Sequence, residues 1–327
     1  MTLLWGTVLF VAGAGVLIAS VEGLVESVIK RAAATGVSGL ALGLLATSLD
    51  PESTATGVAA AFKNLPGVAI GTQIGSVIFI ATLALGLLAI LYPFEVTVPP
   101  FYLWSAGGSA VLAAMVLLSG RLDRPRGLLL LIVFALLARE ATRRVTRSNT
   151  TRASPHRSTS DSHTPADGTE QVETGTSRSD KTVFITRVAV ALIGLIVGAE
   201  VLIEGAQRIL VSLGWSQAIF GSIVVAIAVS AEEALLELLP AHKGHPEISV
   251  GNVLGTIPFL LLASLGVIGV IYPIDIGGSL RSFGAVALMI SVGAALWCLA
   301  RPSTGRHHGI MLVAIYLAYV AAVIIWL

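Results

Sequence analysis

Long apolar stretches, each able to cross a lipid bilayer as a helix, follow one another along most of this chain. A membrane-spanning helix needs about 20 mostly apolar residues, and charges, prolines and glycine clusters divide the sequence into ten such stretches. They lie near residues 3–28, 34–62, 67–92, 100–119, 126–142, 183–211, 215–241, 247–272, 281–300 and 308–327. Only 12% of the residues are charged, against about a quarter in soluble domains. We therefore predict an all-α polytopic membrane protein, surrounded by lipid, with about ten transmembrane helices.

Residue types that are scarce in the chain exclude several classes of protein. The single cysteine, Cys298, excludes a disulfide framework within the chain and a cluster of thiolate ligands. A formal net charge of +1 gives no reason to expect nucleic acid as a partner. The stretch at 3–28 is too long for the apolar part of a signal peptide and lacks a basic start, so we predict the first transmembrane helix there. We expect no cofactor.

The sequence also divides into two matching halves. Residues 146–182 are rich in serine and threonine and almost free of large apolar side chains, which predicts a disordered linker between the regions 1–145 and 183–327. Each region holds five of the predicted helices. The segments GTQIGSVIFIATLALGLLAILYPFEV (71–96) and GNVLGTIPFLLLASLGVIGVIYPIDI (251–276) align without a gap at an offset of 180 residues. Shared Tyr-Pro pairs followed by an acid indicate an internal repeat.

Basic residues predict the orientation of the chain in the membrane. With both termini outside, most of the 20 lysines and arginines fall on the cytoplasmic side, and the linker lies there too. Because five is an odd number, the second half then enters the membrane inverted relative to the first. Two inverted five-helix repeats are typical of secondary transporters, whose substrate site lies near the midplane between the repeats. We expect a multi-pass protein of the cell membrane.

Carboxylates interrupt two of the predicted helices. In LLATSLDPES (44–53), Asp50 and Glu52 flank a helix-breaking proline, and the second half carries Glu232, Glu233 and Glu237 in a comparable place. A carboxylate at the bilayer centre costs about 2.5–3.5 kcal/mol on insertion scales, so such groups face a polar cavity, bind a cation or hold a proton. For Glu237, nearer the end of its helix, a position at the membrane surface is an equal alternative.

The oxygen atoms around Pro51 suit a hard cation. The proline frees a backbone carbonyl one turn earlier, and hydroxyls and carboxylates crowd the same six residues. Ca²⁺ binds such oxygen ligands, and we expect Na⁺ to accept them as well. We predict that Asp50 and Glu52 form one half of an ion site whose other half is Glu232 and Glu233.

These segments resemble the repeats of the sodium/calcium exchanger (cation/calcium antiporter) superfamily, of which the chain is identified as a divergent member. The resemblance rests on ATSLDPE (46–52) and GTQIGSV (71–77) in one half, and on AVSAEE (228–233), KGHPEISVGN (243–252) and GTI (255–257) in the other. It implies that Glu52 and Glu233 are the principal ligands of the transported cation. It also implies assisting oxygens from a set of neutral polar residues, Thr47, Ser48, Ser76, Ser230, Asn252 and Thr256.

The sequence departs from the family pattern in two ways. Apolar Ile80 and Leu260 stand where well-studied members have a polar ligand, which leaves the site richer in carboxylates than usual. The extra residue Asp50 leaves two alignments of the halves open. The motif pairs Glu52 with Glu233, whereas the ungapped offset of 180 residues pairs it with Glu232.

Cation antiport is the function that these features predict. Inward movement of Na⁺ or H⁺ would drive Ca²⁺ or a related cation outward by alternating access. The alternative is a transport-inactive sensor or scaffold of the same fold. An intramembrane enzyme is not expected, because all six histidines fall in predicted loops or at helix ends. The glycine pairs Gly71/Gly75 and Gly251/Gly255 predict close helix packing. The carboxylate pairs Glu22/Glu26 and Glu200/Glu204 are expected at helix ends near water, or otherwise on an ion approach path.

Overall fold

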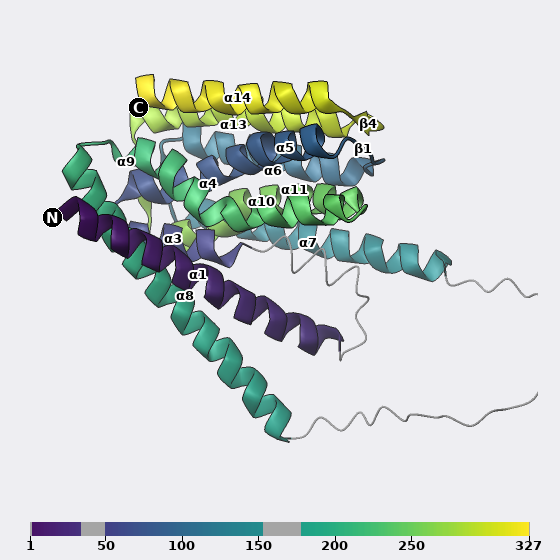
Figure 1. Cartoon of the computed structure of the whole chain (residues 1–327), viewed down its shortest axis with the longest axis horizontal. Helices are drawn as coiled ribbons and strands as arrows, with labels where there is room; N and C mark the ends of the chain where they lie inside the picture. Colours follow the sequence, from purple (N-terminus) through teal and green to yellow (C-terminus); the bar gives the residue numbers. More distant parts are fainter. Residues whose placement is uncertain (1, 34–49, 153–177, 327) are drawn as a thin grey trace, which may run out of the picture.

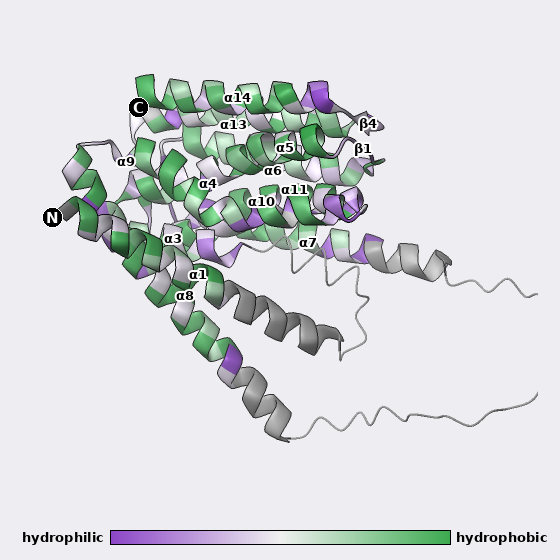
Figure 2. Ribbon diagram, in the orientation of Figure 1, coloured by the Kyte–Doolittle hydropathy of each residue, from purple (hydrophilic) through white to green (hydrophobic). Residues whose placement is uncertain are grey.

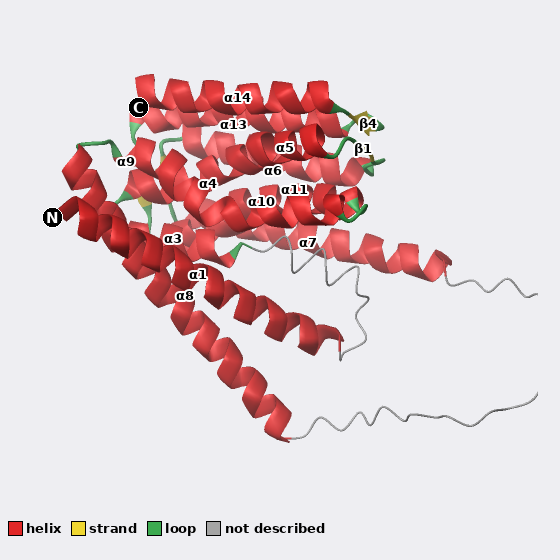
Figure 3. Cartoon of the chain, in the orientation of Figure 1, coloured by secondary structure: helices red, strands yellow, loops and turns green. Residues whose placement is uncertain are grey.

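The computed structural model describes residues 2–33, 50–152 and 178–326, and these are almost entirely helical (Figures 1 and 3). The first half contains α1 (Thr2–Ala33), α3 (Pro51–Phe62), α4 (Pro66–Ile78), the π-helical turn η1 (Phe79–Ala84), α5 (Leu85–Leu91), β1 (Phe94–Glu95), α6 (Pro100–Leu118), β2 (Arg121–Leu122) and α7 (Arg124–Arg152). The second half contains α8 (Arg178–Leu213), α9 (Gln217–Ile219), η2 (Phe220–Val225), α10 (Ala226–His242), α11 (Pro246–Pro258), η3 (Phe259–Ser264), α12 (Leu265–Ile271), β3 (Ile274–Asp275), α13 (Gly278–Leu299), β4 (Ser303–Thr304) and α14 (Arg306–Trp326).

Eight helical stretches among the described residues are long and apolar enough to cross a membrane. Apolar residues cover most of their length, and hydrophilic residues gather toward turns and helix ends (Figure 2). Two predicted spans are not among the eight. Part of the stretch 34–62 lies outside the described residues, and the stretch 126–142 falls in α7, whose apolar run ends at Arg139 and Glu140. The all-α membrane fold predicted from the sequence is confirmed.

Helices α7 and α8 enter both ends of the predicted linker. Helix α7 continues to Arg152 and α8 begins at Arg178. Residues 153–177, the remainder of that linker, lie outside the described residues.

Backbone geometry repeats at the offset of 180 residues found in the sequence. The π-helical turns η1 and η3 start at Phe79 and Phe259, each between two α-helical pieces of one continuous span. The turns that precede these spans also match. Lys63 and Lys243 end their helices with φ of −84° each, and the next residues, Asn64 and Gly244, have φ of 56° and 84°.

Helices and strands of one half pack against those of the other. Helix α5 packs on α14, α6 on α13, and α7 on α12. Two short antiparallel sheets add further links, since β1 pairs with β4 and β2 pairs with β3. The Arg121 guanidinium contacts the Asp275 carboxylate at 2.7 Å across the second sheet. The two halves therefore form one interlocked bundle in the described part of the chain.

Helices α4 and α11 lie at the centre of this bundle. Every residue of α4 from Val68 to Ile78 is buried, and α11 with η3 is buried to a similar extent. Helix α3 packs on α4, and α10 packs on α11 and α4. The carboxylate-bearing helices α3 and α10 therefore both contact the most buried pair of spans.

Helices α1 and α8 pack closely together on the opposite side of the bundle from α13 and α14 (Figure 1). Glycines bring their backbones into contact, because a Cβ atom at Gly13 would lie 2.3 Å from the backbone nitrogen of Leu202. The same holds for Gly205, whose Cβ would lie 2.4 Å from the nitrogen of Phe10. Outside their mutual contact, α8 packs mainly against α3.

Candidate cation site

Three carboxylates meet in the interior of the bundle. One oxygen atom from each of Asp50, Glu52 and Glu233 lies within 4.8 Å of the other two, and the exposed fractions of these residues are only 1–3%. Asp50 and Glu52 belong to the start of α3, and Glu233 comes from the middle of α10. The structure therefore brings together the principal carboxylates that the sequence singled out.

Asp50 serves as the N-cap of α3. Its Oδ1 accepts a hydrogen bond of 2.7 Å from the backbone N–H of Ser53, and Pro51 occupies the first helical position, where no donor is needed. The partial positive charge at a helix start also stabilises nearby carboxylates. The second oxygen of Asp50, Oδ2, is buried without a hydrogen-bond partner in the described structure and is available to a ligand.

The charges of the cluster require a counter-charge. Two carboxylates about 5 Å apart repel each other by about 3 kcal/mol at an effective dielectric constant of about 20. None of the ion pairs formed by the described lysines, arginines and histidines involves Asp50, Glu52 or Glu233. Oδ2 or Oε2 of each is buried without a hydrogen-bond partner in this part of the chain. The arrangement can bind a cation, or protons, in place of an ion pair.

Neutral polar residues predicted as assisting ligands are buried on the helices around the cluster. Their side-chain oxygen or nitrogen atoms have no hydrogen-bond partner among the described residues, as expected of groups that await a ligand. They are Ser76 on α4, Ser230 on α10, and Asn252 and Thr256 on α11. The other two, Thr47 and Ser48, lie outside the described residues.

Glu232 lies beside the cluster without belonging to it. It is half-buried, and it is close enough to act electrostatically on both Asp50 and Glu52. The backbone offset of 180 residues, counted back from Lys63 and Lys243 through helices without a π-turn, aligns it with Glu52. The two halves thus align Glu52 with Glu232, while in space the carboxylate of Glu52 meets that of Glu233.

A glutamine that sequence reasoning did not select supports the start of α3. The side chain of Gln73, fully buried on α4, donates a hydrogen bond of 2.7 Å from Nε2 to the backbone carbonyl of Ser53. Its Oε1 has no partner among the described groups. A glutamine inside the predicted span GTQIGSV was the available signal, because an amide in an apolar helix needs a polar partner.

Close packing at Gly71 and Gly75 positions α4 against the span that carries Glu233. A Cβ at Gly75 would lie 2.2 Å from the backbone oxygen of Ser222 in η2, and one at Gly71 would lie 2.9 Å from the Ser222 hydroxyl. The packing role predicted for this glycine pair is confirmed. Because η2 runs directly into α10, this contact fixes the height of Glu233 relative to α4.

Glu237 is buried rather than placed at the membrane surface. Its exposed fraction is 0%, and neither carboxylate oxygen has a hydrogen-bond partner in the described structure. The surface alternative considered for this residue is therefore wrong. Distance from the helix end was a poor guide, because α11 and α4 pack along α10 and cover it.

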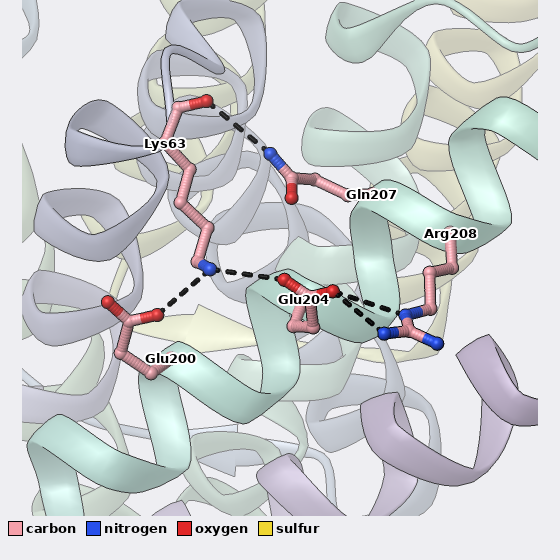
Figure 4. A network of polar contacts seen from close by, with 5 residues as sticks. All are labelled: Lys63, Glu200, Glu204, Gln207 and Arg208. Carbon is pink, nitrogen blue, oxygen red and sulfur yellow. Dashed lines mark hydrogen bonds and ion pairs between the residues drawn. The ribbon is translucent and has the colours of Figure 1, made fainter.

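A charged network joins α3 to α8 away from the cluster (Figure 4). The ammonium of Lys63 contacts Glu200 at 3.0 Å and Glu204 at 3.2 Å, and Glu204 also contacts Arg208 at 3.1 Å. Hydrogen bonding to Glu200, followed by that to Glu204, raises the pKa of Lys63 above its usual value. The pair Glu200/Glu204 is partly exposed, as predicted, and holds two helices together. The side chains of Glu22 and Glu26 lie outside the described part.

Comparison with known proteins places the whole chain among membrane exchangers. A family model described as "Sodium/calcium exchanger protein" matches residues 5–139 and 183–325. The chain is 28% identical over 345 residues to the inner membrane protein YrbG of Escherichia coli strain K12, covering 99% of this chain and 98% of that protein. It is 26% identical over 154 residues to the sodium/calcium exchanger MaX1 of Methanosarcina acetivorans, covering 46% and 42%.

The fold matches that of a solved exchanger. The structure superposes on the sodium–calcium exchanger NCX_Mj with a TM-score of 0.64 at 22% sequence identity, covering 98% of this chain and 99% of that one. At this level of identity the likeness shows a shared fold alone.

Proposed function

We propose that this chain, which belongs to the sodium/calcium exchanger protein family, is a secondary-active antiporter that exchanges Na⁺ or H⁺ for Ca²⁺ or a related cation by alternating access. The family consists of membrane antiporters of cations, and the chain is a membrane protein with that fold. The observation that carries the proposal is the buried cluster of Asp50, Glu52 and Glu233, which has no positively charged partner among the described residues.

Glu52 and Glu233 are the principal ligands in this proposal, and Asp50 contributes its free oxygen Oδ2. Oxygens bind Ca²⁺ at about 2.3–2.6 Å, so two oxygens up to about 5 Å apart can share one ion. The spacing within 4.8 Å in the cluster meets this condition. Because the ligands come from α3 and α10, a bound cation links the two halves, and its release frees them to move relative to each other.

The remaining ligands are neutral. Ca²⁺ takes six to eight oxygens, and buried hydroxyls on α4, α10 and α11 are without partners among the described groups. We assign assisting roles to Ser76, Ser230, Thr256 and Asn252, and also to Thr47 and Ser48. Glu232, which acts electrostatically on the cluster, would adjust its total charge.

The orientation in the cell membrane follows from the distribution of basic residues. We place both termini outside and the linker 146–182 in the cytoplasm, between the repeats 1–145 and 183–327. Protease protection of an epitope inserted in the linker, in right-side-out vesicles, tests this placement. Cleavage without permeabilisation would contradict it.

Calcium uptake into proteoliposomes tests the function. An imposed Na⁺ gradient, and separately a pH gradient, should drive uptake of radiolabelled Ca²⁺ by the wild type. Glu52→Gln and Glu233→Gln should each abolish uptake, whereas Glu247→Gln, which changes an exposed carboxylate on α11, should not. Uptake that persists in both cluster variants would refute the assignment of the ligands. Absence of uptake by the wild type under either gradient would refute calcium antiport.

A transport-inactive sensor or scaffold is the second candidate. It is favoured by the apolar residues Ile80 and Leu260, both fully buried at positions where the family pattern has a polar ligand. Such a protein would bind Ca²⁺ through the cluster without moving it. Calorimetric binding in detergent that depends on Glu52, combined with no flux under any gradient, would favour this candidate over antiport.

A further inference from the structure

Glu237 is a second buried carboxylate whose surroundings differ from those of the cluster. It lies one turn beyond Glu233 on α10, about 6 Å further along the helix axis. Its side chain is fully buried, and both of its oxygens are without a hydrogen-bond partner among the described residues. A carboxylate in this position is not held by any described donor.

Glu237 is electrostatically separate from the cluster. Asp50 and Glu52 act on the carboxylate of Glu233, and Glu237 is not among its electrostatic neighbours. Burial is the influence that acts on Glu237 itself. The two sites therefore share a helix without sharing a ligand set.

Elements packed against α10 bring almost no charge toward Glu237. The sequences of α4, η1, α5 and η2 contain no acidic, basic or histidine residue, and neither do the described side chains of α1. Helix α3 carries Glu52, which belongs to the cluster. Helix α11 carries Glu247, which is exposed and contacts His245 at 3.2 Å. On α10 itself stand the cluster residues and His242, whose Nδ1 contacts the Tyr92 hydroxyl at 3.0 Å.

An isolated carboxylate in such surroundings has to be neutralised. Burial of an ionised carboxylate away from water and counter-charge is so unfavourable that the group takes up a proton or binds a cation instead. A cation such as Ca²⁺ needs several oxygen ligands, and Glu237 is separate from the other carboxylates. The proton is therefore the ligand that fits.

Glu237 has no counterpart in the first half. At the offset of 180 residues stands Gly57, where a Cβ would already lie 2.5 Å from Ile268 and 2.9 Å from Nε2 of Gln73. The first half thus has no room for a side chain at this place, and the second half carries a carboxylate there. The ionisable group is a property of one repeat, which is the asymmetry that a separate counter-ion site requires.

We propose that Glu237 binds a proton at a site separate from the cation cluster and supplies the proton half of the exchange. The proposal deepens the antiport function proposed above and rests on it. One carboxylate oxygen forms the O–H bond when water reaches α10 from one side of the membrane, and the proton returns to water on the other side. Because α10 also carries Glu233, a movement that opens the cluster also moves Glu237.

Infrared spectroscopy and proton flux together test the proposal on the full-length protein. The wild type should show the C=O stretching band of a protonated carboxylic acid that shifts in deuterated water, and Glu237→Gln should lack it. In proteoliposomes loaded with a pH dye, the number of protons moved per Ca²⁺ should fall by one in Glu237→Gln. The matched control Glu247→Gln should keep both the band and the ratio.

Each outcome decides a different statement. A band that persists unchanged in Glu237→Gln would overturn the proton site, and an unchanged ratio of protons to Ca²⁺ would overturn its role in exchange. Glutamine has the shape of the protonated acid, so the variant should fold, and a single peak in size-exclusion chromatography verifies this. Loss of Ca²⁺ flux in the wild type would instead contradict the proposed function, while the infrared band still reports on Glu237.

Discussion

Replacement of Gly13 by alanine should force apart the two helices that pack most closely in the bundle. A Cβ at this position would lie 2.3 Å from the backbone nitrogen and 2.6 Å from the Cα of Leu202, and 2.8 Å from the carbonyl oxygen of Gly198. All three neighbours are backbone atoms of α8, which cannot rotate away as a side chain would. Ordinary van der Waals contact begins at 3.4 Å, so α1 and α8 must separate by about 1 Å at this point.

The expected cost can be isolated with a second glycine on the same helix. A Cβ at Gly15 would meet no atom within 4 Å, so Gly15→Ala changes only the helix propensity, which favours alanine by about 1 kcal/mol. Gly13→Ala has the same gain but adds the overpacking cost of about 1–3 kcal/mol. The free energy of unfolding of Gly13→Ala should therefore be about 1–3 kcal/mol below that of Gly15→Ala.

Unfolding by titration with SDS in mixed micelles, followed by tryptophan fluorescence, measures this difference. The midpoint for Gly13→Ala should fall clearly below that for Gly15→Ala, with similar slopes for both variants. Equal free energies of unfolding would refute the packing of α1 on α8 at Gly13. A lower value for Gly15→Ala would mean that α1 is rotated relative to the structure described here.

Three further predictions concern polar contacts. Asp50→Asn should keep the helix cap, whereas Asp50→Ala should unfold with a free energy about 1 kcal/mol lower, and both should bind Ca²⁺ more weakly than the wild type in calorimetry. Lys63→Met should lower the free energy of unfolding by about 1 kcal/mol. Since the folded-state pKa of Lys63 is raised, this difference should be constant between about pH 7 and 9 and shrink only above the unfolded pKa of about 10.4. Gln73→Leu, which leaves the carbonyl of Ser53 without its donor, should cost about 1–3 kcal/mol in the same unfolding assay.

The sequence predicted the cluster because its members break the strongest pattern in the chain. A carboxylate inside an apolar stretch is costly enough to indicate a site without any knowledge of its neighbours. Proline at position 51 further indicated where α3 begins, and Asp50 caps the helix there. For these residues the local signal and the tertiary contact coincide, so Asp50, Glu52 and Glu233 were found together.

Contacts between distant segments could not be predicted in the same way. The hydrogen bond from Gln73 to Ser53 and the contacts of Lys63 with Glu200 and Glu204 join residues that are 20 to about 140 positions apart. Pattern analysis assigns each residue to a helix face but says nothing about which helix covers that face. Glu237 shows the same limit, since its depth is set by α4 and α11 rather than by its distance from His242.

Differences between the two halves bear on alternating access more than their similarity does. In a transporter built from inverted repeats, inward- and outward-facing states arise when the two repeats exchange conformations. With identical side chains in both repeats, the two states would have equal energy. Here the backbones match at an offset of 180 residues, but the buried polar side chains do not. The offset pairs Asp50 with Ser230, Ser53 with Glu233, Gly57 with Glu237, Thr72 with Asn252, and Gln73 with Val253. Each conformation therefore presents a different set of carboxylates to the side that is open, so the affinities for cation and proton must differ between the two sides, and these five pairs determine by how much.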